Sequence, residues 1–196
     1  MQIFYEEFFW DKIYKDKTAA WGYEPAECLK KWIKEFPANA TVLDLGCGSG
    51  RNANYIAQHG FKVYGYDWSE ETIEQAKNIG GDANYYVKDM MLENWGSTQY
   101  DVVIDFGYFH FFAPELRSHY HEQLKSVLKS GGIYINESGR YKKWKSNPLK
   151  YIPPYLEKEV WEEFDYLNIE KLEEDIIPPH GNYGEYPCWN VFARKL

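Results

Sequence analysis

Three glycines at alternating positions, Gly46, Gly48 and Gly50, constrain the fold of this chain more than any other feature. They follow a short apolar run, residues 41–45, that predicts a buried strand, and they precede a segment, residues 52–59, that predicts a helix. Glycine adopts backbone conformations that other residues avoid, and it lets a ligand approach the main chain closely. A glycine loop between a strand and a helix is where open α/β sheets bind nucleotides.

Strands and helices alternate along the first two thirds of the chain. Four more strands are predicted at residues 62–66, 83–87, 101–105 and 133–136. Three more helices are predicted at residues 25–36, 69–80 and 114–129. The last third is different: an irregular segment at 140–154, a helix at 157–164, and two strands at 166–173 and 189–195. This order predicts an α/β fold with a mostly parallel sheet and helices on both faces.

Two acidic residues beside the loop indicate which nucleoside it binds. Asp67 ends the second predicted strand, 21 positions after Gly46, where a carboxylate can accept hydrogen bonds from ribose hydroxyls. Asp44 lies on the strand just before the loop, and the spacing is Asp-x-Gly-x-Gly-x-Gly rather than G-x-G-x-x-G. An acid is unfavourable beside a pyrophosphate but suits an ammonium group. S-adenosyl-L-methionine (SAM) carries an ammonium and no phosphate, so the pattern favours SAM over a nicotinamide dinucleotide.

These residues resemble the motifs of class I SAM-dependent methyltransferases. Residues 42–50 resemble the first motif, residues 66–69 the ribose-binding strand end, residues 88–90 the adenine-binding turn, and residues 128–132 the turn before the fifth strand. The resemblance implies a single Rossmann-like α/β domain with a seven-stranded sheet and an antiparallel C-terminal hairpin. Residues 9–11 and 20–22 are similar to thiopurine and thiol methyltransferases, and residues 109–117 to the tellurite-resistance methyltransferase group.

The resemblance also implies a division of the chain and a cofactor site. We expect one methyltransferase domain, 1–196, with N-terminal cap helices (1–36), a SAM-binding core (37–139), a substrate flap (140–165) and a C-terminal strand pair (166–196). The implied cofactor-binding residues are Trp21, Asp44, Gly46, Cys47, Gly48, Gly50, Asp67, Trp68, Asp89, Met90 and Phe106. The product would be S-adenosyl-L-homocysteine, and no metal is expected.

Methyl transfer requires alignment of the acceptor and exclusion of water, and it needs a base only when the acceptor atom is protonated. Three residues after the fourth and fifth strands are candidates for catalysis: Tyr108, His110 and Glu137. For His110, a structural histidine between aromatic residues is the slightly preferred interpretation over a base, and Glu137 is equally interpreted as a base or as a strand-end acid. Both alternatives stay open at this stage.

Aromatic residues make up 19% of the chain and predict an aromatic-lined substrate pocket. The predicted substrate-binding residues are Tyr5, Phe9, Tyr14, Tyr141, Trp144, Tyr151, Tyr155 and His180. Aromatic rings bind cationic or planar ligands well, and an acidic protein favours cations. The alternative is that half of these rings belong to the ordinary core.

The formal net charge of -8 and the lack of a dense basic run argue against a nucleic-acid substrate. The turn at residues 105–108 lacks the two prolines used for amine methylation in nucleic acids, and no cysteine nucleophile lies near it. The N-terminus is not a signal peptide, no run reaches the roughly 20 apolar residues of a membrane span, and three scattered cysteines predict no disulfide framework. We therefore expect a cytoplasmic monomer or homodimer without a membrane partner.

The sequence thus predicts a SAM-dependent methyltransferase of a small molecule, with a thiol, an amine or another small nucleophile as acceptor. Two alternatives remain: a methyltransferase of a protein or tRNA side chain, and a non-catalytic binding module that retains the fold.

Overall fold

The computed structural model describes residues 22–112, 114–140, 156–178 and 185–196. The helices are α2 (Glu27–Trp32), α3 (Arg51–Gln58), α4 (Glu70–Ile79), α5 (Pro114–Val127) and α6 (Glu157–Glu163), with 3-10 turns η1 (Ile33–Glu35) and η2 (Phe109–Phe111). The strands are β1 (Thr41–Leu45), β2 (Lys62–Asp67), β3 (Asn84–Val87), β4 (Tyr100–Phe106), β5 (Leu128–Gly139), β6 (Leu167–Ile177) and β7 (Tyr186–Lys195).

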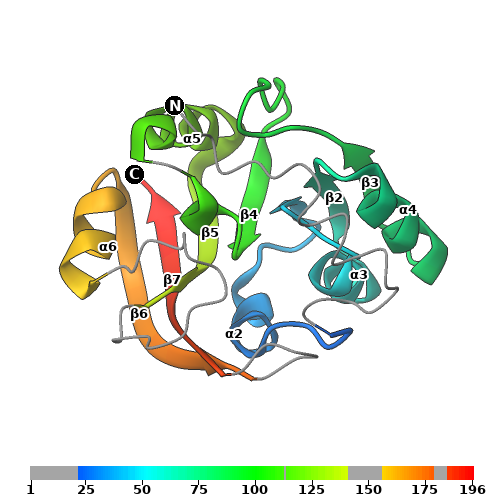
Figure 1. The fold of residues 1–196 in the computed structure, drawn as a ribbon, viewed down its shortest axis with the longest axis horizontal. Coiled ribbons are helices and arrows are strands. Elements are labelled where there is room, and N and C mark those ends of the chain that lie inside the picture. The colour runs from blue at the N-terminus through cyan, green and yellow to red at the C-terminus, as the bar shows by residue number, and fades with distance from the viewer. Residues whose placement is uncertain (1–21, 113, 141–155, 179–184) are drawn as a thin grey trace.

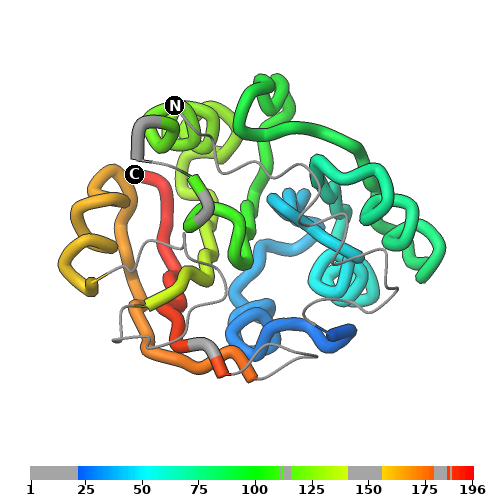
Figure 2. Tube along the Cα trace, viewed as in Figure 1, coloured from blue at the N-terminus to red at the C-terminus, as the bar shows by residue number. Residues whose placement is uncertain are grey.

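The seven strands form one sheet in the order β3-β2-β1-β4-β5-β7-β6. Strands β1 to β5 pair in parallel, whereas β7 runs antiparallel to both of its neighbours, β5 and β6. The expected α/β domain with a mostly parallel seven-stranded sheet and an antiparallel C-terminal strand pair is thereby confirmed. Figure 2 shows β7, the last segment of the chain, inserted between β5 and β6. The carboxyl ends of the parallel strands meet at one edge of the sheet, where ligands bind in open α/β folds.

Helices cover both faces of the sheet, so two apolar clusters form (Figure 1). On one face, Leu29 of α2, Ala53 of α3 and Ile73 of α4 pack against the sheet. On the other, Tyr120 and Leu124 of α5 and Phe164, which follows α6, do so. The inner strands are therefore buried on both sides, which explains why they read as continuous apolar runs.

Local sequence signals explain where several elements begin and end. The Ser69 side chain accepts a hydrogen bond from the Thr72 N–H at 3.2 Å and caps α4. Gly60, which follows α3, has φ +84, the left-handed conformation that ends many helices. The helix expected over residues 25–36 divides into α2 and the turn η1.

Two predicted boundaries differ from the structure because of strand pairing. The glycines of residues 131–132, expected between a helix and a strand, lie inside β5, since Leu128 already pairs with Tyr100 before the register shifts to Val102 and Ile133. The C-terminal strands are also longer than expected. Strand β6 pairs with β7 from Leu167 to Ile177, so the polar residues near its end are still part of the ladder.

Among the described residues, no helix is both long enough and apolar enough to cross a membrane.

Candidate cofactor and acceptor site

The glycine loop after β1 is shaped by close neighbours as well as by its backbone conformation. Gly46, Gly48 and Gly50 have φ values of +66, +54 and +84. A Cβ on Gly46 would lie 2.8 Å from Cβ of Tyr108, and a Cβ on Gly50 would lie 2.3 Å from the Tyr85 hydroxyl. Both the conformation and the lack of space therefore require glycine, and the loop presents bare main chain to a ligand.

Asp67 links the end of β2 to this loop. Its Oδ2 accepts a hydrogen bond from the Gly48 N–H at 3.0 Å, and its Oδ1 accepts one from the Ser69 N–H at 3.1 Å. The Cys47 N–H donates to the Tyr66 carbonyl at 3.0 Å, so the loop and the end of β2 are joined at two points. The carboxylate predicted to hold a ribose therefore lies against the glycine loop, 8% exposed.

Asp44, on β1 just before the loop, is 1% exposed, and its Oδ2 has no hydrogen-bond partner. Burial raises its pKa well above the usual range, opposed by the Arg51 charge and reinforced by Asp105 and Asp67. An unpaired buried carboxylate oxygen is costly unless a ligand satisfies it. An ammonium group at this position would do so, and the acidic surroundings favour a cation. SAM carries both an ammonium and a sulfonium, so the residues present fit this cofactor.

The remaining expected cofactor residues lie at the ends of the neighbouring strands. Asp89, after β3, forms a turn in which its Oδ1 accepts from the Met91 N–H at 3.0 Å. The Met90 side chain is fully buried in the cluster on the α5 face, and its carbonyl accepts from the Trp95 indole at 2.8 Å. Trp68 follows Asp67 directly and is partly exposed, and Phe106 ends β4 and packs on the α3 face. Cys47 is buried, and burial raises the pKa of its thiol.

Asp105, the residue before Phe106, holds the loop that follows β4. Its carboxylate accepts hydrogen bonds from the Tyr108 N–H at 2.8 Å and from the Phe109 N–H at 3.0 Å. It also accepts one from the Tyr120 hydroxyl of α5 at 2.7 Å, and Tyr120 is 2.9 Å from the Tyr134 hydroxyl of β5. Burial raises the pKa of Asp105 to about 6, and these hydrogen bonds oppose the rise.

Two of the predicted catalytic residues lie on this loop. Tyr108 is 9% exposed and contacts Gly46 as described above, so the loop after β4 meets the glycine loop. His110 is buried, and its Nδ1 accepts a hydrogen bond from the Gly139 N–H at 3.2 Å. Burial lowers the pKa of His110 to about 3, with Arg117 contributing, so the ring is neutral and its proton is on Nε2. The lone pair of Nδ1 is therefore used by Gly139, and Nε2 carries the one N–H donor of the ring.

Glu137, the third predicted catalytic residue, lies on β5 directly opposite Phe106 of β4, so their side chains share one face of the sheet. It is 6% exposed. Burial raises its pKa to about 7, the Arg51 charge lowers it, and Asp175 raises it. Arg51, the first residue of α3, therefore influences both Asp44 and Glu137.

Within the predicted substrate flap, residues 156–165 form α6 and the residues beside it, whereas residues 141–155 lie outside the described part of the chain. Outside it lie Trp21 of the expected cofactor set and all eight expected substrate residues: Tyr5, Phe9, Tyr14, Tyr141, Trp144, Tyr151, Tyr155 and His180. Their roles stay predictions. In the part of the chain that the structure describes, no group of three or more His, Cys, Asp or Glu side chains is arranged to hold a metal ion.

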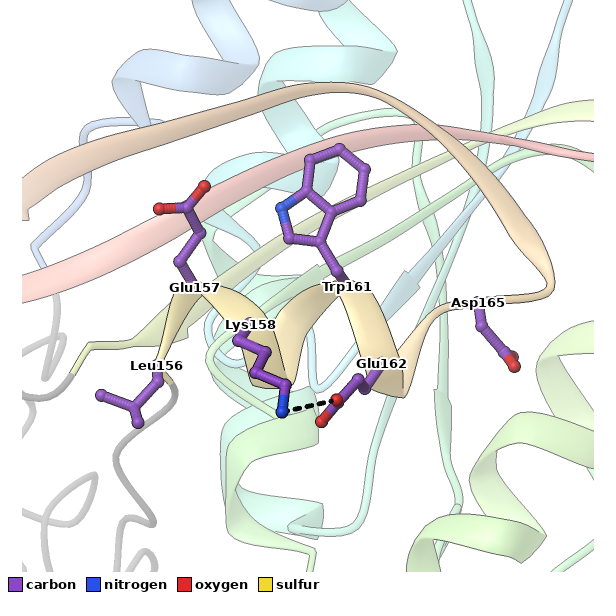
Figure 3. Close-up of a pocket in the computed structure, with 6 residues that line it drawn as sticks. All are labelled: Leu156, Glu157, Lys158, Trp161, Glu162 and Asp165. Atoms are coloured by element: carbon purple, nitrogen blue, oxygen red, sulfur yellow. Dashed lines mark ion pairs between the residues drawn. The ribbon is translucent and has the colours of Figure 1, made fainter.

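A surface hollow of about 860 Å³ lies on α6 rather than at this site. Figure 3 shows the side chains that line it, all from α6 and the residues flanking it, including the ion pair between Lys158 and Glu162. Helix α6 covers the β6–β7 end of the sheet, away from β1 and its glycine loop (Figure 1). The hollow contains none of the carboxyl-edge residues and is open to solvent, so it is not the cofactor site.

Sequence reasoning did not single out Asp105, Tyr85 or Arg51. Tyr85, whose hydroxyl donates to Asn54 at 2.7 Å, fills the space behind Gly50 and Gly65 and so determines where glycine is required. Asp105 could have been found from its place at the end of a buried strand, where a carboxylate needs donors. No sequence signal identifies the partners of these three residues, because each contact joins distant parts of the chain.

Comparisons with known proteins identify the family of this chain. Residues 42–132 match the family described as "Methyltransferase domain". An uncharacterized methyltransferase of Schizosaccharomyces pombe is 30% identical over 116 residues, which cover 54% of this chain and 80% of that protein. EEF1A lysine methyltransferase 2 of Danio rerio is 28% identical over 160 residues, 69% of each chain.

Two solved structures share the fold at low sequence identity. TehB from Haemophilus influenzae superposes with a TM-score of 0.75 at 21% identity, covering 95% of this chain and 66% of that one. The 1,6-didemethyltoxoflavin-N1-methyltransferase of Burkholderia thailandensis, solved with its substrate and S-adenosylhomocysteine, has a TM-score of 0.73 at 20% identity, covering 94% and 84%. The chain belongs to the class I SAM-dependent methyltransferases. Its activity is the transfer of a methyl group from SAM, as the sequence predicted.

Proposed function

We propose that this methyltransferase acts on a small molecule whose acceptor atom carries a proton, an amine above all. The observation that carries the proposal is Glu137, a buried carboxyl group that lies beside Phe106 at the carboxyl edge of the sheet. Strongly perturbed carboxyls in such positions are characteristic of functional sites.

The cofactor half of the site would be formed by the glycine loop, Asp44 and Asp67. Asp44 would accept from the ammonium of the methionine moiety, and Asp67 from the ribose, while the loop glycines let the cofactor approach the main chain. SAM, when bound, supplies a methyl group activated by its sulfonium. We further propose that Trp68, Asp89, Met90 and Phe106 surround the adenine end.

Glu137 would accept the proton that the acceptor atom loses. A base works best when its pKa lies close to the working pH, and a pKa of about 7 meets that condition. The gathered carboxyls of Asp44, Asp67 and Glu137 favour a cationic acceptor such as a protonated amine. Tyr108 and the Nε2–H of His110 would form the wall opposite Glu137 and position the acceptor through hydrogen bonds.

A small acceptor is supported by burial, since Tyr108, His110 and Glu137 are each less than a tenth exposed. The negative net charge and the cysteines, all three of them buried and reduced, support a cytoplasmic metabolite rather than a nucleic acid. A protein lysine side chain is the second candidate, because it is also an amine and because of the similarity to the Danio rerio protein named a lysine methyltransferase.

To test the class of acceptor, a cell extract is separated into a small-molecule fraction and a protein fraction. Each fraction is incubated with the protein and with SAM labelled in its methyl group. We expect label in the small-molecule fraction. Label confined to the protein fraction would replace the proposal by the lysine alternative, and label in neither fraction would contradict both.

The role of Glu137 is tested separately, with the unmethylated acceptor that the labelling experiment identifies as the substrate. For the wild type, kcat/KM should rise through about pH 7, as Glu137 ionises. Glu137→Gln should lower kcat on the order of 100-fold or more and remove that rise. Glu173→Gln, on β6 in register with Asn190, removes an exposed carboxylate of the same sheet and should change neither. An unchanged pH profile in Glu137→Gln would exclude Glu137 as the base.

A further inference from the structure

The loop after β4, residues 107–112, is attached to the rest of the molecule by side chains at both of its ends. At its start, Asp105 accepts from the backbone N–H groups of Tyr108 and Phe109. At its end, Arg117 Nε of α5 donates to the Phe112 carbonyl at 3.4 Å, and the Arg117 guanidinium lies 5.5 Å from the centre of the Phe109 ring. Because both ends of the loop are held, the side chains of Tyr108 and His110 are kept in fixed positions.

Asp105 is fixed in turn by a chain of hydroxyl groups. Tyr120 donates to Asp105 Oδ2 and is within hydrogen-bond distance of Tyr134, and all three residues are fully buried. The Tyr120 ring also packs against the rings of Phe109 and Phe112, with centroids 4.7 and 5.1 Å apart. The carboxylate therefore joins three elements, β4, α5 and β5, to one short loop.

The loop in turn determines where Tyr108 meets the glycine loop. Gly46 has no space for a Cβ, because the Cβ, Cγ and Cδ2 atoms of Tyr108 lie 2.8 to 2.9 Å from that position. A shift of Tyr108 would therefore change the shape of the surface that Gly46 offers. On the same loop, His110 reaches across to the Gly139 N–H at the end of β5.

We propose that Asp105 is a positioning residue for the methyl-transfer site. It holds the backbone N–H groups of Tyr108 and of Phe109, the residue before His110, and it is itself held by Tyr120. It thereby orients Tyr108 and His110 without contact with the cofactor or the acceptor. The inference rests on the proposed function only in placing the acceptor beside this loop. The hydrogen-bonded arrangement itself exists in the free protein and can be tested there.

The first experiment measures hydrogen exchange of the Tyr108 and Phe109 amides in the free protein. Asp105→Ala removes the acceptor of both, and their exchange should accelerate more than tenfold while amides of β1 and β7 are unchanged. Asp105→Asn retains one acceptor oxygen and should restore slow exchange to within about threefold of the wild type. Tyr120→Phe removes one hydroxyl and should give an intermediate value.

Tyr100→Phe is the matched control. Tyr100 is a fully buried tyrosine of the same strand whose hydroxyl is 3.0 Å from that of Tyr66, and it lies at the other end of β4. Its replacement removes a comparable buried hydrogen bond and should leave exchange at Tyr108 and Phe109 unchanged. If Asp105→Ala and Tyr100→Phe gave the same exchange pattern, Asp105 would be an ordinary buried group and the proposal would be wrong.

The second experiment measures SAM binding by calorimetry for the same variants. We expect Asp105→Ala to weaken binding five- to tenfold through the Gly46 contact, Asp105→Asn about twofold, and Tyr100→Phe not at all. Faster exchange with unchanged SAM affinity would restrict the role of Asp105 to loop stability and overturn the positioning proposal. Neither measurement needs the acceptor, so failure of the small-molecule proposal would leave this test intact.

Discussion

The two halves of the carboxyl edge are built in different ways. In the half at β1 and β2, main-chain groups and glycines form the surface, and its key contacts join residues about 20 positions apart, such as Gly48 and Asp67. In the half at β4 and β5, buried side chains from α5 and β5 hold a loop in place through Asp105 and His110. The first half is suited to a cofactor common to many enzymes, whereas the second can change with the acceptor.

The largest effect is expected from Gly46→Ala, at the position where the two halves of the carboxyl edge are in contact. The new Cβ would lie 2.8 Å from the Tyr108 Cβ, an atom too close to the backbone to move aside, at a residue with φ +66. The overlap forces the glycine loop and Tyr108 apart, and restoring their binding positions would cost about 3 kcal/mol, so SAM affinity should fall roughly 100-fold. Calorimetric titration with SAM measures the change.

The control for Gly46→Ala is Gly60→Ala, a glycine with φ +84 and no atom within 4 Å of the added Cβ. It carries the same conformational strain without overlap, so it should lower stability by about 1 kcal/mol and leave SAM binding unchanged. Equal losses of SAM binding in both variants would mean that strain alone, and not the contact with Tyr108, determines the effect.

Glu137→Gln tests the acceptor half through the pH dependence of stability. Burial raises the pKa of Glu137 from 4.5 to about 7, so between these values the unfolded chain releases the proton and the folded chain keeps it. Stability contributed by this group therefore falls as pH rises from about 4.5 to 7. Glutamine does not titrate, so the variant should gain about 2 to 3 kcal/mol relative to the wild type between pH 4 and pH 8.

Urea denaturation at the two pH values measures this difference for Glu137→Gln, with Glu173→Gln as the exposed control. A constant difference between the variant and the wild type at both pH values would show that folding does not shift the pKa of Glu137, contrary to the effect expected from its burial.

Asp67→Asn tests the cofactor half with a smaller change. Asparagine can accept at one atom only, so one of the hydrogen bonds from the Gly48 and Ser69 N–H groups is lost, together with the charge that would face the ribose. SAM binding should weaken about 10- to 30-fold, which is roughly 1.4 to 2 kcal/mol. The control is Asp101→Asn, which removes a carboxylate bonded to Lys129 at the start of β4. Similar losses in both variants would indicate a general effect of net charge.

Ser69→Ala has the smallest expected effect. It tests whether the cap of α4 acts on that helix alone or also on the cofactor half. The Ser69 hydroxyl caps α4, and its loss should cost about 1 kcal/mol of stability, measured by thermal denaturation. Ser126→Ala, whose exposed hydroxyl bonds to the Gln123 carbonyl within α5, should be neutral. A drop in SAM affinity larger than twofold in Ser69→Ala would show that the cap also orders the loop around Asp67.

The fold and the cofactor half could be predicted from the sequence because their signals are local. Glycine spacing, alternating strands and helices, and acids at strand ends each depend on residues close together in the chain. They identified the sheet, the class of enzyme and the positions of Asp44 and Asp67. Their boundaries differ where pairing between strands extends an element, as at Leu128 and along β6, and where the helix expected over 25–36 divides into α2 and η1.

The sequence by itself determined the α/β order and the SAM pattern, since a loop of three glycines after a buried strand leaves few conformational choices. Only the tertiary structure decided that Tyr85 and Tyr108 occupy the space above those glycines, that His110 uses Nδ1 for Gly139, and that Glu137 is buried beside Phe106. The physical reason is that burial and hydrogen-bond partners depend on residues brought together from distant strands and helices. These contacts determine a pKa or a rotamer, and the neighbouring residues in the sequence do not reveal them.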